Sequence, residues 1–458
     1  QTFPQQQYGL ETWDSLNLDI DTTVMGMPSE SDWILNAPYN DKTCMRNALV
    51  YDIARKTGHY APRTRFCELL LNNEYRGIYI MMEKIKRNAN RVDISKLTPA
   101  DTSGDALTGG YIIKIDKVTG AGGTGWNSNY IGFGTPIKFQ YEYPEDVDMM
   151  PQQKLYIRSY VDSFERALNA SWFLNPDSGY KNYIDLQSFV DYFILNETCK
   201  NVDAYRISTF LHKQKITKGG KLVIGPAWDY NIGFWNADYC QGYLYTGWQY
   251  QFNGICGTSG DNNVPFWWNK MMQDPAFTSL LKCRWDSLRT TTLNTDTLWN
   301  QIDSIALVLD EAKSRHFIKW PILGVQTWAN PSPIPADYAG EISAMKGWIV
   351  NRMNWLDANM PGMCTIVNLE EKDFFNSNIY PNPAANSVTI SYKLDATKNV
   401  VVQLYNVIGE KLLEHNYSHR QAGMNQIQLD DLSQYGKGIY FIKLIADGEE
   451  SVKKLVIQ

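Results

Sequence analysis

One stretch of the sequence, residues 201–231, reads as a β-hairpin with an aspartate near each end. Asp203 precedes a short apolar strand, the glycines at 219–220 mark the turn, and the returning strand Leu222–Ile224 leads towards Asp229. Because a hairpin brings its two ends together, this pattern predicts that the two carboxylates lie close to one another in the fold.

Two carboxylates that meet at one point suit a hard divalent cation and the phosphates that such a cation neutralises. Polar side chains nearby extend the predicted metal-ligand set, which consists of Asp203, Ser208, Asp229 and Asn231. The same two aspartates are the predicted catalytic pair. Aspartates beside hairpins also cap turns and bind backbone amides, so a purely structural role is the alternative.

Composition narrows the classes of function. The chain has 458 residues, of which 44% are hydrophobic, and this is enough for a large core and more than one domain. Its formal net charge of −6 argues against a nucleic-acid partner, because such proteins carry a basic surface. No apolar run reaches the roughly 18 residues of a membrane span, so no transmembrane segment is predicted. The five histidines and seven cysteines form no zinc-like cluster.

Cys240 and Cys256 flank a polar loop that is rich in tyrosine and glycine. A bridge between them would close this loop and stabilise the fold by about 3 kcal/mol, and we expect it on account of the loop's composition. Two buried free thiols are the alternative. Disulfides persist in oxidising compartments, so the bridge also favours an exported protein.

The residue pattern changes near position 365. Before this point helical and strand patterns alternate, and after it apolar residues recur at every second position, as at Val388, Ile390 and Tyr392. Short strands separated by Gly, Asn and Asp turns are typical of a small β-sandwich. The predicted parts are a larger α+β domain at 1–362, a linker at 363–378 and an all-β, immunoglobulin-like sandwich at 379–458.

The start of the larger domain predicts a helix followed by a hairpin. The helix is expected over Asp41–Thr57, where apolar residues form one stripe and a glycine follows. Strands are expected at Phe66–Leu71 and Gly77–Met82, joined by a polar turn. Further predicted elements are a strand at Tyr111–Ile115 and helical regions at 146–170, 186–199 and 296–359.

Several separated segments resemble signatures of the CotH family, atypical secreted kinases named for a bacterial spore-coat protein. In chain order they are DWILNAPYNDKTCMRNALVYDIARKTG, PRTRFCELLLNNEYRGIYIMMEKIKRNANRVDI, GGYIIKIDK, ETCKNVDAY and GPAWDYN. The similarity runs from the first residues to about Pro361, roughly three quarters of the sequence. Several ordered motifs together are more specific than any one alone.

The resemblance implies a divergent, two-lobed domain similar to protein kinases, with ATP and Mg²⁺ or another divalent cation as cofactors. The implied reaction transfers the γ-phosphate to Ser or Thr hydroxyls of a secreted or surface protein. Protein kinases place a catalytic Asp, a metal-binding polar residue, a hairpin and a metal-binding Asp in an order that Asp203, Ser208 and Asp229 follow. Asp229 would bind the metal ion, and Asp203 would orient or deprotonate the acceptor hydroxyl or share the metal.

By the same resemblance, Met81–Ile85 would be the hinge that contacts the adenine, with Glu83 and Lys84 at its centre. Positive charge for the triphosphate is expected from Arg46, Lys84 and Lys114. Each of these residues has a structural alternative. Arg46 would pair with a neighbouring acid, Glu83 and Lys84 would form a solvated strand end, and Lys114 would lie on an outer sheet surface.

The sequence departs from the CotH pattern at its start. Relatives carry an Arg-Gly-x-Ser-Ser segment followed by Pro-Lys-Lys, whereas Gln5, Gln6 and Gln7 stand in the lysine region here. Glutamine can hydrogen-bond to phosphate but supplies no charge, and a lost charge-assisted contact costs on the order of a few kcal/mol in a transition state. Two readings stay open. Either the sequence begins inside its domain, with the N-terminal part missing, or this member is weakened or inactive.

The tail resembles the C-terminal sorting domains of the type IX secretion system of Bacteroidetes. The resemblance rests on IYPNPAANSVTIS, LYNVIGEKLL, GMNQIQLDDLSQYGKGIYFIKL and the terminal KKLVIQ. It implies that the secretion machinery is a partner, that the chain is exported through the periplasm and the outer membrane, and that it ends at the cell surface or outside the cell. A generic immunoglobulin-like module is the alternative.

Two other functions stay open. The 15 Trp and 28 Tyr residues, together with the paired carboxylates, fit a glycoside hydrolase or glycan-binding protein, although core packing is the favoured explanation of the aromatic residues at 234–252 and 266–268. The missing lysines fit an inactive kinase-like scaffold. The glycine run at 120–125 is expected to be a mobile surface loop, because Trp126 stands where a Walker motif needs Lys.

Overall fold

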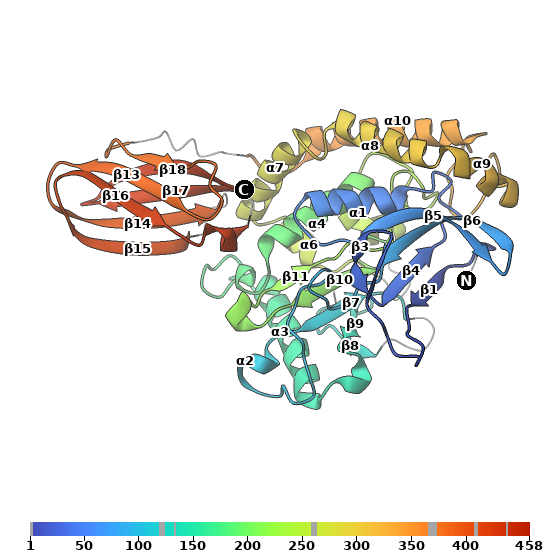
Figure 1. Cartoon of the computed structure of the whole chain (residues 1–458), viewed down its shortest axis with the longest axis horizontal. Helices are drawn as coiled ribbons and strands as arrows, with labels where there is room; N and C mark the ends of the chain where they lie inside the picture. Colours follow the sequence, from blue (N-terminus) through green and yellow to red (C-terminus); the bar gives the residue numbers. More distant parts are fainter. Residues whose placement is uncertain are drawn as a thin grey trace. The chain divides into compact units, whose positions relative to one another are not determined.

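The computed structural model describes residues 3–118, 124–131, 134–257, 263–364, 373–406, 411–436 and 438–458. The chain has two compact units, Gln1–Met363 and Cys364–Gln458. The first unit mixes helices and sheets, and the second is built from strands (Figure 1). The predicted combination of a mixed helix-and-sheet part with an all-β tail is therefore confirmed.

The N-terminal part of the first unit contains a four-stranded antiparallel sheet. Its order is β1-β4-β6-β5, with β1 at Tyr8–Glu11, β4 at Asp32–Asn36, β6 at Glu74–Glu83 and β5 at Thr64–Leu71. A small hairpin of β2 (Thr22–Val24) and β3 (Met27–Glu30) lies between β1 and β4 in the chain. Helix α1 (Arg46–Lys56) follows β4 and shares a hydrophobic core with β6 through Leu49, Ile53 and Ile80.

Helix α1 begins at Arg46, later than the sequence predicted, because Asp41 folds the preceding residues into a turn. The Asp41 carboxylate accepts hydrogen bonds from the backbone N–H groups of Thr43 and Arg46 at 3.1 and 2.8 Å. The β5–β6 hairpin agrees with the prediction. Its turn places Asn72 and Asn73 at φ values of 52° and 63°, a left-handed conformation that asparagine tolerates.

A second sheet of five strands contains the hairpin that carries the two aspartates. Its order is β11-β10-β7-β9-β8. The strands are β11 (Leu222–Ile224), β10 (Thr209–Lys213), β7 (Tyr111–Ile115), β9 (Lys138–Tyr143) and β8 (Gly125–Asn127). Strand β10 runs antiparallel to both β11 and β7. The predicted hairpin is therefore confirmed, and it is extended into a sheet by β7.

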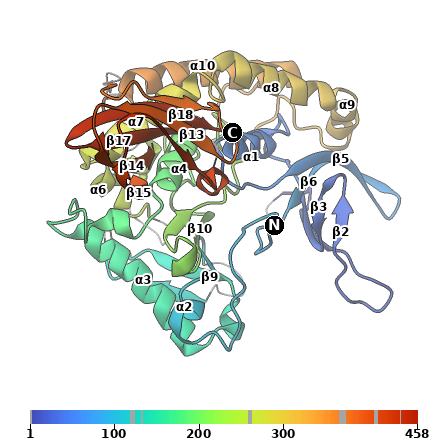
Figure 2. The same cartoon turned by 60° about the vertical axis from the view of Figure 1, so that its left-hand side comes forward.

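Helices make up the rest of the first unit. They are α2 (Gly104–Leu107), α3 (Pro151–Asn169), α4 (Leu186–Cys199), α5 (Phe252–Cys256), α6 (Trp267–Met271), α7 (Pro275–Arg289), α8 (Thr295–Val308), α9 (Asp310–Lys319) and α10 (Tyr338–Asn359). Figures 1 and 2 show α8, α9 and α10 along one side of this unit. The helical region predicted at 296–359 is interrupted between α9 and α10, where four prolines lack the N–H that a helix needs. No helix in the described ranges combines the length and apolar character of a membrane span.

The second unit consists of two antiparallel sheets, β12-β13-β16 and β15-β14-β17-β18. The strands are β12 (Asn378–Tyr380), β13 (Val388–Leu394), β14 (Lys398–Asn406), β15 (Lys411–Arg420), β16 (Gly423–Leu429), β17 (Gly438–Ala446) and β18 (Glu449–Ile457). Alternate side chains from both sheets, such as Ile390, Val402 and Ile442, form one buried core. The period-two pattern of the sequence thus reflects one buried face in strands such as β13, β14 and β17, whereas β15 has no fully buried residue.

Candidate functional site

Asn201 joins the two predicted catalytic aspartates through their backbone. Its side-chain nitrogen donates to the Asp229 carbonyl oxygen at 3.2 Å, and its side-chain oxygen accepts from the Asp203 N–H at 3.3 Å. Asn201 follows the end of α4 and is 3% exposed, so water competes little for either bond. The structure therefore brings Asp203 and Asp229 together.

Helix α1 fixes the residues after the hairpin from a different direction. The Tyr51 hydroxyl accepts the Asp229 N–H at 3.0 Å, and the Asn47 side-chain oxygen accepts the Tyr230 N–H at 2.6 Å. Asn47 and Tyr51 are four residues apart, so they lie on one face of the helix. Asp229 has a left-handed backbone with φ of 61°, which is uncommon for a residue with a side chain and is often found at functional sites.

Asp229 is an exposed residue, and no group among the described residues donates a hydrogen bond to its carboxylate. Protein nevertheless surrounds it on most sides. This loss of hydration, reinforced by the negative charge of Asp203, raises the pKa of Asp229 to about 6. Lys117 lowers this pKa and Asp116 raises it. The carboxylate is thus short of compensating positive charge.

Asp203 has a cationic partner of its own. Arg206 donates to Oδ1 of Asp203 at 2.6 Å, and its Nε donates to the Val202 carbonyl oxygen at 3.1 Å. The guanidinium group also lies over the Phe252 ring, 4.1 Å from its centre. The pair orients Asp203 and leaves its second oxygen, Oδ2, without a donor in the part of the chain that the structure describes.

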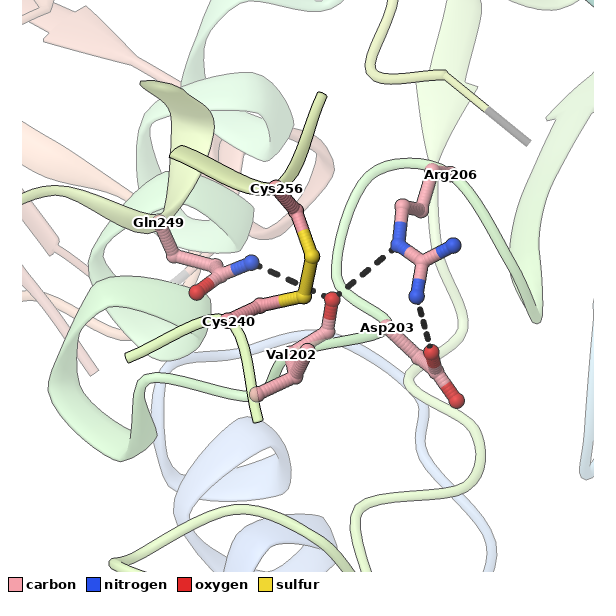
Figure 3. The surroundings of a disulfide bond; sticks show 6 residues. All are labelled: Val202, Asp203, Arg206, Cys240, Gln249 and Cys256. Carbon is pink, nitrogen blue, oxygen red and sulfur yellow. Dashed lines mark hydrogen bonds and ion pairs between the residues drawn. A yellow bond between two sulfur atoms is a disulfide. The ribbon is translucent and has the colours of Figure 1, made fainter. Parts of the chain in front are cut away.

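The predicted disulfide between Cys240 and Cys256 is present beside this segment. Figure 3 shows that Gln249, from the loop that the disulfide closes, and Arg206 point at the same carbonyl oxygen, that of Val202. The Gln249 side-chain nitrogen donates to it at 3.1 Å. The loop therefore supports the residue immediately before Asp203.

Buried cations anchor the disulfide loop to the helices. Burial, reinforced by the nearby charge of Arg352, lowers the pKa of Lys200 to about 7. Arg352 of α10 donates to the Tyr245 and Gly247 carbonyl oxygens at 2.9 and 2.7 Å and pairs with buried Glu197 of α4 at 3.0 Å. The Lys200 ammonium donates to three further loop carbonyls, those of Gln241, Leu244 and Thr246.

Asp116 and Lys117 belong to the site, although the sequence analysis did not select them. Both follow β7, and the pairing of Ile115 with Thr209 places Asp116 beside Ser208. The Ser208 N–H donates to the Asp116 carboxylate at 3.4 Å. Both residues stand in the GGYIIKIDK motif, so the motif was a usable signal, but nothing in it reveals the pairing with β10.

Ser208 and Asn231, the other predicted metal ligands, use their nitrogen atoms in structural hydrogen bonds. The Asn231 side-chain nitrogen donates to the Asn40 side chain at 3.0 Å, and the Ser208 N–H donates to Asp116 as described above. The Ser208 backbone is left-handed, with φ of 51°. The Ser208 hydroxyl oxygen and Asn231 Oδ1 accept no hydrogen bond from the described residues. No three His, Cys, Asp or Glu side chains converge as a metal-binding group within the described ranges. A cation here would therefore complete its shell with neutral oxygens, water or phosphate.

Arg46 and Glu83 are fully buried. Arg46 donates to the Asp41 carboxylate and to the carbonyl oxygens of Gly233 and Phe234, the latter two at 3.1 and 3.3 Å. Glu83 accepts from Arg63 at 2.8 Å. Arg46 therefore has the acidic partner named as its alternative, and it supports the segment after Asp229 from inside the protein. The solvated strand end named as the alternative for Glu83 is wrong, because Glu83 is buried and paired with Arg63.

Lys84 and Lys114 are partly exposed and paired with acids. Lys84 donates to Asp32 at 3.3 Å and Lys114 to Glu142 at 2.8 Å. Lys84 also lines a cavity of about 550 Å³ beside β1, together with Gln7, Gly9, Trp13 and Ile34. The structure thus places Lys84 at a cavity large enough for a small molecule.

A chain of side-chain amides leads from β1 to α1. The Gln7 side-chain oxygen accepts from Asn36 at 3.3 Å, and the Asn36 side-chain oxygen accepts from Asn47 at 3.2 Å. Asn47 is the α1 residue that holds the loop of Asp229. Gln5 and Gln6 instead donate to nearby backbone carbonyls. Of the three glutamines in the lysine region, Gln7 is therefore the one connected to the aspartate site.

The aromatic residues at 266–268 pack largely in the core, as the favoured explanation predicted. Trp267 and Trp268 are fully buried, and the Trp267 indole donates to Glu165 at 2.9 Å. Burial raises the pKa of Glu165 to about 7. Within the predicted glycine loop, residues 120–123 lie outside the described residues.

Two family models match most of the chain. Residues 1–356 match the model described as CotH kinase protein, and residues 378–458 match the model described as secretion system C-terminal sorting domain. A mixed helix-and-sheet unit followed by an all-β type IX sorting domain defines a protein that is exported to the cell surface or secreted. The chain belongs to the CotH kinase protein family.

No curated protein matches the chain. Among solved structures, dimeric latent PorU from Porphyromonas gingivalis is similar, with 21% identity over 18% of this chain and 9% of that chain and a TM-score of 0.16. The chain thus spans only a small part of the length of that protein, and the likeness carries no conclusion about fold or function.

Proposed function

We propose that this protein is a metal-dependent phosphotransferase that moves the γ-phosphate of ATP to a Ser or Thr hydroxyl of an exported protein. One observation carries the proposal. Asp229 is an exposed residue whose carboxylate has no donor among the described residues, and its pKa is raised by loss of hydration and by the charge of Asp203. Like charges held together favour a bound cation, because the cation offsets their repulsion.

Asp229 is the principal ligand that we assign to this cation, with the free oxygens of Asp203, Ser208 and Asn231 as further candidates. Mg²⁺ or another divalent ion would supply the positive charge that phosphoryl transfer needs at the β- and γ-phosphates. Lys117 lies near enough to Asp229 to lower its pKa, so it is a further candidate for contact with phosphate.

Asp203 is the proposed base. Because Arg206 holds Oδ1, Oδ2 remains available to accept a hydrogen bond from the acceptor hydroxyl. The hydroxyl oxygen forms a bond to the γ-phosphorus, the bond from that phosphorus to the bridging oxygen breaks, and ADP leaves. The hydroxyl proton passes to Asp203 and then to water.

The cavity beside β1 is the proposed nucleotide site. Its volume of about 550 Å³ suits a ligand of this size, and it is lined by Lys84 of the predicted hinge. The hydrogen-bonded amide side chains that start at Gln7 connect this cavity with the loop of Asp229. This connection supports a nucleotide that is bound between two kinase-like lobes. In this arrangement Arg46 and Glu83 are supports, and Lys114 remains a secondary candidate for contact with phosphate.

Transfer of labelled γ-phosphate from ATP to exported proteins, with and without Mg²⁺, tests the proposal. Asp229→Asn should abolish transfer, because the amide is a poor ligand for a divalent cation. Its unfolding temperature should be unchanged or higher, since the repulsion from Asp203 is relieved. Asp177→Asn, at an exposed turn, is the matched control and should keep full activity. Wild-type transfer rates in Asp229→Asn would refute the metal assignment.

A catalytically inactive, kinase-like scaffold is the second candidate, and Gln7 in the lysine region is the observation that favours it. Gln7→Lys separates the two functions. In an enzyme weakened by the missing charge, the lysine should raise kcat/KM by about tenfold, which corresponds to one charge-assisted contact of modest strength. An inactive scaffold would show no transfer with either residue.

A further inference from the structure

The segment between β1 and β2 is an ordered turn. The Ile20 N–H donates to the Thr12 carbonyl oxygen at 2.8 Å, and the Asp14 N–H donates to the Leu18 carbonyl oxygen at 2.8 Å. The Asp14 carboxylate in turn accepts from the N–H groups of Leu16 and Leu18 at 2.7 and 3.0 Å. These bonds hold the turn in shape without help from its apolar side chains.

Those apolar side chains face solvent instead. Their exposed fractions are 55% for Trp13, 75% for Leu16, 60% for Leu18 and 46% for Ile20. Met25, in the turn between β2 and β3, is 48% exposed. Single exposed apolar residues are common on protein surfaces, but several of them on one short ordered segment indicate an interaction site. We call the segment 12–25 the docking hairpin.

The docking hairpin is also acidic. The first 41 residues contain seven Asp and Glu and no Lys or Arg. Asp19 and Asp21 are exposed and take part in no ion pair within the described residues. They alternate along the chain with Leu18 and Ile20, so this exposed segment carries both apolar and negative side chains.

We propose that the docking hairpin binds a polypeptide segment in which lysine or arginine alternates with apolar residues. The apolar side chains of the two partners would leave water together, and the basic side chains would pair with Asp19 and Asp21. A lipid surface fits less well, because anionic head groups would be repelled and neutral ones would leave both acids unpaired. Trp13 also lines the cavity beside β1, so a docked segment would pass close to the nucleotide. The idea that the docking hairpin holds a substrate of the enzyme rests on the proposed phosphotransfer.

Binding of a fluorescent peptide that alternates lysine and leucine around one serine tests the proposal. The full chain carrying Asp229→Asn is used, so that phosphate transfer does not interfere. We expect binding that weakens as salt rises. Combined replacement of Leu16, Leu18 and Ile20 by serine should weaken binding by at least about tenfold. Asp19→Asn with Asp21→Asn should remove most of the salt dependence.

The matched control replaces Leu307 and Val308 of α8 by serine. These side chains are 77% and 68% exposed, so the loss of apolar surface is comparable, and peptide binding should not change. Binding by the triple serine variant within about twofold of its parent would overturn the proposal. Equal binding of a peptide with glutamate in place of lysine would also overturn it.

A vesicle experiment distinguishes a lipid surface from a polypeptide as the occupant of the docking hairpin. If the triple serine variant loses affinity for phosphatidylcholine vesicles while its peptide binding is unchanged, the hairpin is a membrane contact and the proposal fails. The docking proposal and the phosphotransfer proposal can be tested separately, because peptide binding is measured on a protein that transfers no phosphate. Peptide binding together with no phosphorylation of the serine by wild-type protein would refute the proposed function and support the docking hairpin.

Discussion

Asn201 donates a hydrogen bond from its side-chain amide to the backbone carbonyl of Asp229, 28 positions later in the chain, at 3.2 Å. The bond connects the end of α4 to the residue that follows the β10–β11 hairpin. Because α1 holds the same residue through Tyr51, the position of Asp229 is set by two helices rather than by its own loop. The left-handed backbone of Asp229 can persist since these contacts offset its strain.

Replacement of Asn201 by alanine should therefore damage both stability and site geometry. The Asp229 carbonyl and the Asp203 N–H would each lose a partly buried hydrogen bond, and together the two losses should cost about 1–3 kcal/mol. Denaturant unfolding measures this loss, and phosphate transfer should fall with it. Asn300→Ala, at an exposed position of α8, is the control and should leave both unchanged. A fully stable Asn201→Ala protein would show that the bridge is not needed.

The pKa of Asp229 should respond to its neighbours with predictable signs. Asp203→Asn and Asp116→Asn should each lower it below about 6, and Lys117→Gln should raise it, because these charges act on it in those directions. The carboxyl carbon chemical shift of Asp229 against pH measures the midpoint. Mg²⁺ binding should weaken as pH falls through about 6, since the protonated carboxyl is a poor ligand. Three variants with the wild-type midpoint would contradict this electrostatic account.

Loss of the disulfide should affect activity as well as stability. Cys240→Ser with Cys256→Ser opens a loop of sequence separation 16 and should lower the unfolding free energy by about 3 kcal/mol. Gln249→Ala keeps the disulfide but removes the hydrogen bond to Val202, so it should cost only about 1 kcal/mol. We expect both proteins to lose transfer activity. Full activity in each folded variant would mean that the loop does not position Asp203.

Glu165 should make stability depend on pH. Its pKa is raised from 4.5 to about 7 by burial, so folding favours the protonated form. Its stabilising contribution is fully present below pH 4.5, is lost progressively as pH rises to about 7, and does not change further above that. Glu165→Gln cannot ionise and should remove this decline, which amounts to about 3 kcal/mol. Denaturant unfolding across this pH range, with Glu145→Gln as an exposed control, measures it.

The hairpin with its two aspartates was predictable because its signals are local. The turn glycines and the apolar runs on either side of them lie within about thirty residues, and the bounds of α4 and β11 follow from the same kind of pattern. Asp116 was not predictable in this way. Its carboxylate meets the Ser208 N–H across a separation of 92 residues, and periodicity says nothing about which strands pair at such a distance.

Arg46 illustrates a different limit. An arginine in a family-like motif was predicted to neutralise phosphate, but α1 is buried at six consecutive positions, Arg46 to Tyr51. A helix buried on all sides gives a cation no route to solvent, so the guanidinium must find its partners inside the protein. The apolar stripe in the sequence did not reveal this, since the polar side chains beside it, Arg46 and Asn47, are buried as well.

The two helix contacts to Asp229 and Tyr230 have a mechanical consequence. Asn47 binds the Tyr230 amide and also Asn36 of β4, which is hydrogen-bonded to Gln7 at the cavity beside β1. A displacement of α1 along its axis would therefore pull on both the loop of Asp229 and the rim of that cavity. Any ligand or partner that shifts this helix therefore acts on the aspartate site and on the cavity beside β1 in a single movement.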